Sequence, residues 1–298
     1  MLYRADGLKG SEIRTRDGAS GSIEDLYFDD VSWTVRYLVV DTGSWFSGKR
    51  VLISPQAMRG VEREGGPLTL DLTEQQIKDS PAWDSETTVS RYHEERLSQY
   101  YGWAPYWVTP AGVYPWAGIY TYPPFPAGTP EVQERISGAQ GSYANDLRPG
   151  SVDRSQDIHL RSFKEVKGYG LRATDGDIGE LDDLLIDASS WRITHLVADS
   201  RKWWPGGQVL VDRGMVEDIS WSEHKIVVGM TKDEVKQAPA YDSQMKMDDA
   251  FLSRLANYYQ RIAAHRHTLR SPGPSASGMM GSEDRSLRNP PSDFLYAK

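Results

Sequence analysis

The stretch TDGDIGELDDLLIDASSWRITHLVADSRKWWPGGQVLV, residues 174–211, decides the fold. It opens on Asp175-Gly176, a dipeptide typical of tight turns, because glycine accepts positive φ and aspartate can bond its own backbone. Three runs of apolar and β-branched residues follow, at 178–187, 191–199 and 208–211. Such runs between turn residues predict strands. The stretch therefore predicts a small antiparallel sheet that buries its apolar side chains by curling or by packing on another element.

The same pattern occurs 158 residues earlier, as RDGASGSIEDLYFDDVSWTVRYLVVDTGSWFSGKRVLI at residues 16–53. Aligned without a gap, residues 8–84 and 166–242 share 23 identities in 77 positions. The chain is therefore a tandem duplication, and each half is predicted to fold in the same way. The turn and corner residues that both copies share are Asp17/Asp175, Gly18/Gly176, Gly21/Gly179, Asp25/Asp183 and Asp29/Asp187.

In order, both copies contain DGxxG, a strand with paired acids, a Trp, YLVVD or HLVAD, a W-x-x-G loop and VLI or VLV. This order resembles the PRC-barrel family, which includes the cytoplasmic barrel of the H polypeptide of the photosynthetic reaction centre and the barrel of the ribosome-maturation factor RimM. The resemblance covers both repeats and is strongest to bacterial proteins with two such barrels. It implies a mainly-β chain built from two tandem small barrels, each followed by short helices.

The repeat and the composition divide the chain into six parts. They are a first barrel repeat at 1–84, a helix at 85–101, an aromatic and proline-rich linker at 102–165, a second barrel repeat at 166–242, a helix at 243–270 and a disordered tail at 271–298. Thr73 and Thr231 each begin a Thr-x-x-Gln/Glu capping box, which predicts a short helix after each barrel. The last helix is expected to pack its apolar stripe on the second barrel.

The linker is distinctive, because residues 102–126 hold eight aromatic residues and six prolines. Prolines at this density exclude a helix or a central strand. Rigid aromatic side chains make large contacts at low entropic cost, so this segment either binds a partner or packs over the barrels. Together with two loop aromatics, the candidate partner contacts are Phe46, Trp204, Trp103, Tyr106, Trp107, Trp116 and Tyr120. Trp45 and Trp203, the position that both repeats share, are expected in the core.

Paired acids at Glu24-Asp25, Asp29-Asp30 and Asp182-Asp183 are the best candidates for acid–base chemistry. Neighbouring residues of a strand point to opposite faces, however, so the two carboxylates of a pair are not expected to reach the same substrate. The shared aspartates are therefore interpreted as corner residues or as partners of Arg14 and Arg172. No metal-ligand motif is present among the six histidines, and the chain has no cysteine for thiolate or disulfide chemistry.

The charge excludes one class of partner. The net charge is −8, and the two repeats carry nine basic against thirteen acidic and nine against fourteen acidic residues, so direct nucleic-acid binding by the barrels is not expected. The sequence shows no signal peptide and no transmembrane run, which predicts a cytoplasmic protein. We expect a non-catalytic interaction or scaffold protein without a cofactor. A peripheral component of a photosynthetic complex, like the H polypeptide, and an enzyme using the repeated aspartates are the alternatives, and a homo-oligomer stays open.

Overall fold

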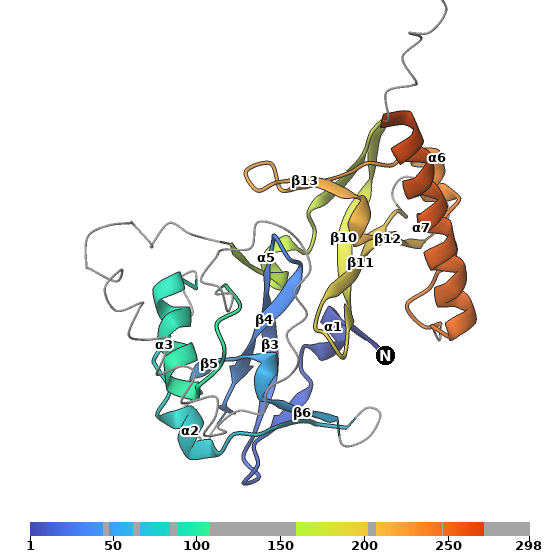
Figure 1. Ribbon diagram of the computed structural model, residues 1–298. Coiled ribbons are helices and arrows are strands. Elements are labelled where there is room, and N and C mark those ends of the chain that lie inside the picture. Colours follow the sequence, from blue (N-terminus) through green and yellow to red (C-terminus); the bar gives the residue numbers. More distant parts are fainter. Residues whose placement is uncertain are drawn as a thin grey trace, which may run out of the picture.

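The computed structural model describes residues 1–43, 48–61, 66–83, 89–107, 159–201, 207–245 and 247–270. Within these residues the chain is mainly β, as predicted, and forms two sheets, one from each repeat (Figure 1). The buried apolar side chains of both repeats belong to one hydrophobic cluster. Leu26 and Leu184, which occupy the same repeat position, are fully buried in it.

The sheet of the first repeat follows the order β5-β4-β3-β2-β7-β6. Its strands are β2 (Glu12–Arg14), β3 (Ser20–Asp29), β4 (Thr34–Asp41), β5 (Arg50–Ile53), β6 (Met58–Val61) and β7 (Leu68–Leu70), and the 3-10 helix η2 (Pro55–Ala57) joins β5 to β6. All pairs are antiparallel except β2 with β7. The alternation at Leu68, Thr69 and Leu70 buries both leucines and leaves the threonine half-exposed, as period-two patterning predicts.

The second sheet repeats this order, β12-β11-β10-β9-β14-β13, and adds β15 beside β12. Its strands are β9 (Gly170–Ala173), β10 (Gly176–Asp187), β11 (Ile193–Asp199), β12 (Gln208–Asp212), β13 (Val216–Ser220), β14 (Lys225–Val228) and β15 (Ala240–Tyr241), with the 3-10 helix η4 (Arg213–Met215) after β12. Among the described strands, no pairing joins the two ends of either path, so each unit is an open sheet instead of the closed barrel that the resemblance implies. In the second repeat, β15 and the Tyr259 hydroxyl, which donates to the Leu210 carbonyl, cover the β12 edge.

Helices follow each sheet, and the last of them has 22 residues. They are α2 (Glu74–Lys78), α3 (Arg91–Tyr101), α6 (Lys232–Lys236) and α7 (Asp249–Arg270). Both predicted capping boxes are present, at Thr73 with Gln76 and at Thr231 with Glu234. The stripe predicted for the last helix packs on the second repeat, since Phe251 and Leu255 are buried.

The two repeats exchange their leading segments, which the sequence did not predict. β1 (Leu2–Arg4) and α1 (Ala5–Leu8) precede the first repeat, but β1 pairs with β10 of the second. β8 (Leu160–Ser162) and α5 (Phe163–Val166) precede the second repeat, but β8 pairs with β3 of the first. Figure 1 shows α5 beside β3 and β4, and α1 beside β10 and β11. β8 and all of α5 except Val166 lie inside the range 102–165 that composition assigns to a linker, because such short elements leave no periodicity in the sequence.

Candidate functional site

The repeated aspartates Asp25 and Asp183 hold the exchanged segments. Asp183 is fully buried and accepts hydrogen bonds from Arg4 Nε at 2.7 Å and from the Asp6 backbone N–H at 3.0 Å. Asp25 occupies the equivalent place and accepts from Ser162 Oγ at 2.5 Å and from the Lys164 N–H at 3.1 Å. Each carboxylate thus binds the first turn of a helix that comes from the other repeat.

These contacts correct the interpretation that the shared aspartates pair with Arg14 and Arg172. Arg14 hydrogen-bonds Glu12 of its own strand, and the arginine at Asp183 is Arg4. Burial raises the pKa of Asp183, while the N–H donors and Arg4 oppose that effect. Both carboxylates therefore join the two repeats.

The second shared pair, Asp29 and Asp187, forms the corners between adjacent strands. Asp29 accepts from the backbone N–H groups of Val31 and Ser32, and Asp187 accepts from those of Ser189 and Ser190. The hydroxyl groups of the two serines and the N–H groups at the second corner lower the pKa of Asp187, although burial opposes them. Each aspartate thus closes its corner by accepting backbone N–H groups, which is typical turn chemistry of this residue type.

The two corners contact each other, and the contact is symmetric between the repeats. Trp33 and Trp191 both adopt positive φ, 53° and 56°. The Val35 N–H donates to the Trp191 carbonyl at 2.9 Å, and the Ile193 N–H donates to the Trp33 carbonyl at 2.7 Å. Because each bond is the repeat image of the other, the pair reproduces inside one chain the symmetric contact of a two-fold dimer.

The turn residues Asp17 and Asp175 also have structural partners. Asp17 accepts from Thr15 Oγ1 at 2.7 Å and from the Glu74 N–H at 2.9 Å, and Asp175 accepts from the Lys232 N–H at 2.8 Å. The Thr15 hydroxyl and the Glu74 N–H lower the pKa of Asp17. The turns that begin each hairpin are thus tied to the helices α2 and α6.

The shared glycines are required by geometry. Gly18, Gly176 and Gly179 have positive φ, of 96°, 135° and 139°. A Cβ on Gly21 would overlap the Asp41 carbonyl oxygen, and one on Gly179 would overlap the Asp199 carbonyl oxygen. These glycines shape turns and close strand contacts, and they do not form a phosphate-binding loop.

A buried ionic cluster lies between α3, β4 and residue 159. Glu94 is fully buried; its Oε1 accepts from the Tyr106 hydroxyl at 2.7 Å, and its Oε2 lies 2.9 Å from Arg91 Nη1. His159 Nε2 lies 3.0 Å from the Tyr106 hydroxyl and 2.5 Å from Arg91 Nη2. The Arg36 guanidinium stacks over the Tyr106 ring at 3.7 Å.

This cluster was not found from the sequence, because its members are far apart in the chain and the second repeat does not share them. At the repeat positions of Glu94 and Arg36 stand Leu252 and Thr194. Burial raises the pKa of Tyr106 well above its usual value, so its hydroxyl remains a hydrogen-bond donor. The cluster therefore fastens residues 106 and 159, the two ends of the region between the repeats, to the first repeat.

The structure places three of the predicted partner contacts. Trp103 is 3% exposed and stacks on Tyr101 with ring centroids 4.1 Å apart. Tyr106 belongs to the buried cluster, and Trp107 is half-buried with the Arg91 guanidinium 4.2 Å from its ring. Over residues 103–107, packing is therefore observed. The predicted contacts Phe46, Trp116, Tyr120 and Trp204 lie outside the described residues, as do Trp45 and Trp203.

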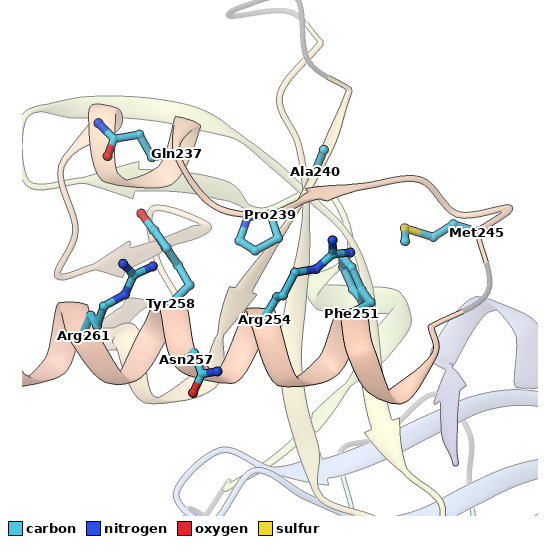
Figure 2. Close-up of a pocket in the computed structure, with 9 residues that line it drawn as sticks. All are labelled: Gln237, Pro239, Ala240, Met245, Phe251, Arg254, Asn257, Tyr258 and Arg261. Atoms are coloured by element: carbon cyan, nitrogen blue, oxygen red, sulfur yellow. The ribbon is translucent and has the colours of Figure 1, made fainter.

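A groove of about 560 Å³ runs along α7, between this helix and the segment that follows α6 (Figure 2). Arg254, Asn257 and Arg261 of α7 are exposed along it, while Phe251 and Tyr258 form its buried floor. Figure 2 shows Pro239, Ala240 and Met245 on the opposite side. The helical period of the sequence predicts the apolar stripe of α7 but not this groove, whose second wall comes from the segment 237–245, which includes β15.

Two kinds of site are absent from the described residues. No group of three or more histidine, aspartate or glutamate side chains in them is arranged to hold a metal ion. No helix in them has the length and apolarity needed to cross a bilayer.

Comparison with protein families assigns the first repeat to a known domain family. Residues 1–77 match the model of the PRC-barrel domain. The matched range includes the exchanged segment β1–α1 and reaches into α2. No curated protein matched the chain.

Proposed function

We propose that this chain, whose residues 1–77 form a domain of the PRC-barrel family, is a non-catalytic scaffold that binds a protein partner. The observation that carries the proposal is the reciprocal exchange of β1–α1 and β8–α5 between the repeats. Exchange joins two sheets through paired strands, shared side chains and a common core. Two units that are joined through paired strands and one core suit a platform more than a catalyst.

The use of the repeated acids supports the same proposal over the enzyme alternative. Asp25 and Asp183 accept hydrogen bonds from the other repeat, and Asp29 and Asp187 accept them from corner N–H groups. A general acid or base must reach the proton that it transfers in a bound substrate. Carboxylates that are already bonded to backbone donors in the fold are better suited to holding structure.

The experiment is reconstitution of a complex. The full chain would be used to capture partners from an extract of its source organism, and each partner would be purified and mixed with it. We expect one protein to co-elute with the chain at a fixed ratio in size-exclusion chromatography with light scattering. The proposal is overturned if no protein does so and if an activity is found that Asp25→Asn or Asp183→Asn abolishes while the melting temperature holds.

A further inference from the structure

The groove along α7 carries two positive side chains. Arg254 and Arg261 are exposed, and no ion pair of the described residues involves either of them. By comparison, Arg201 of the second repeat pairs with Asp199, and Arg266 of the same helix pairs with Glu217. The second repeat, residues 166–242, has nine basic and fourteen acidic residues, so the two arginines of α7 form a local positive site beside an acidic unit.

Both guanidinium groups lie near aromatic rings of the groove. The Arg254 guanidinium carbon is 5.9 Å from the centroid of Phe251, and that of Arg261 is 5.9 Å from the centroid of Tyr258. The Tyr258 ring is fixed, because its hydroxyl donates to the Glu234 carbonyl. Rings that are held in place limit the positions of the two arginines, which lowers the entropic cost of binding an anion.

The other end of the groove is apolar. Met245, Ala240 and the edge of Phe251 form it (Figure 2). The groove is therefore positive along Arg254 and Arg261 and apolar near Met245.

We infer that this groove binds an extended, acidic segment of a protein partner, and this inference rests on the scaffold role proposed above. Two carboxylates of the segment would pair with Arg254 and Arg261, and an apolar side chain would enter beside Met245. The two arginines are seven residues apart on one helix, which is about 10 Å at 1.5 Å per residue. A segment in the extended polyproline II conformation rises about 3.1 Å per residue with three residues per turn, so acids at positions i and i+3 lie on one face, about 9 Å apart.

Charge complementarity selects this partner over a nucleic acid. A polyphosphate backbone would meet the surplus of acids on the repeat, whereas a short acidic segment meets only the two arginines. Arginine also suits carboxylates, because its planar guanidinium donates two parallel hydrogen bonds.

The test uses the full chain and fluorescein-labelled ten-residue peptides. One peptide carries a leucine followed by two glutamates three residues apart, and its control carries lysine in place of both glutamates. Binding is measured by fluorescence anisotropy for the wild type and for the double variant Arg254→Glu/Arg261→Glu. The matched control is Arg96→Glu, because Arg96 is the exposed repeat counterpart of Arg254 on α3.

We expect the wild type and Arg96→Glu to bind the acidic peptide, and the double variant to lose at least about tenfold in affinity. The lysine peptide should bind at least about tenfold more weakly to the wild type. Equal binding of both peptides, or affinity that the double variant retains, overturns the inference. Sedimentation of the wild type as a dimer and of the double variant as a monomer would also overturn it, since a second copy would then fill the groove. If the double variant still forms the reconstituted complex, the scaffold proposal stands and only the groove is excluded.

Discussion

Single residues of this protein show how a duplicated sequence keeps its geometry. Gly21 and Gly179 occur in both repeats at a place where the backbone of one strand meets the end of the next. A Cβ there would overlap the carbonyl oxygen of Asp41 or Asp199. The identity of these glycines therefore follows from a close backbone contact, which no substitution can keep without moving a strand.

Gly179→Ala should destabilise the fold by about 3 kcal/mol, from the backbone strain at a φ of 139° and from the overlap with Asp199. Gly10→Ala is the control, because Gly10 also has positive φ but has open space around it. Gly10→Ala should lower the free energy of unfolding by only about 1 kcal/mol. Urea denaturation monitored by tryptophan fluorescence measures the free energy of unfolding of both variants. Equal losses for the two variants would show that the contact with Asp199 is not the cause.

His93 is a residue at which the two repeats differ, and the difference has a pH signature. Its repeat counterpart is Phe251, which is 2% exposed. Burial, with a contribution from Arg96, lowers the pKa of His93 from 6.5 to about 4. The unfolded chain binds a proton at this histidine between pH 6.5 and about 4, while the folded chain does not, so protonation favours unfolding. The contribution of His93 to the free energy of unfolding is therefore complete above pH 6.5 and is lost as the pH falls.

His93→Phe should therefore reduce the fall in melting temperature between about pH 7 and about pH 4.5 by a few degrees. The phenylalanine fills a site that already accepts that side chain in the second repeat. Scanning calorimetry at a series of pH values measures the effect, and His265→Phe, at an exposed position of α7, is the control. If the melting temperature falls equally with pH in the wild type and in His93→Phe, His93 is not buried in its neutral form.

At the scale of elements, the segment after α3 distinguishes the two alternatives for the aromatic region, which are packing on the protein and binding a partner. Gly102 ends α3 in the left-handed conformation, and the Trp103 N–H donates to the Ser98 carbonyl at 3.0 Å. This turn brings the Trp103 ring onto Tyr101. The start of the aromatic region is thus part of the first repeat.

Trp103→Ala should cost about 3–4 kcal/mol, because it opens a cavity beside Tyr101 in a buried place. Trp107→Ala is the control and should cost about 1 kcal/mol, since this half-buried ring mainly contacts the Arg91 guanidinium. Thermal unfolding followed by circular dichroism compares them. A loss below about 1 kcal/mol for Trp103→Ala would favour the alternative in which this tryptophan serves a partner.

The elements that the sequence predicted are those with a local signal. The long strands β3 and β10, both capping boxes and the stripe of α7 follow from alternation, turn residues and helical period. β1 and β8 have three residues each, so they carry no period, and their partners lie more than 130 residues away. The cluster of Glu94, Tyr106 and His159 was missed for the same reason, since only the fold brings these residues together.

At the scale of the whole molecule, duplication has produced an internal two-fold contact. The bonds from Val35 to Trp191 and from Ile193 to Trp33 are images of each other, and so are the pairings of β1 and β8. The sequence register predicted two similar units, but it did not predict their exchange, because pairing within a unit and pairing between units satisfy the same local pattern. A chain joined in this way should not unfold as two independent domains.

Scanning calorimetry should therefore show one transition for the wild type, with equal calorimetric and van't Hoff enthalpies. Asp183→Ala removes the bonds to Arg4 and to the Asp6 N–H, and leaves a half-buried guanidinium without this carboxylate. We expect it to cost about 2–3 kcal/mol and to make the calorimetric enthalpy exceed the van't Hoff enthalpy, because the hold of the second repeat on α1 weakens. Asp177→Ala, at an exposed position of the same strand, should leave one transition at an unchanged temperature. Two transitions in the wild type would mean that the repeats unfold separately, and the exchange would then not be what couples them.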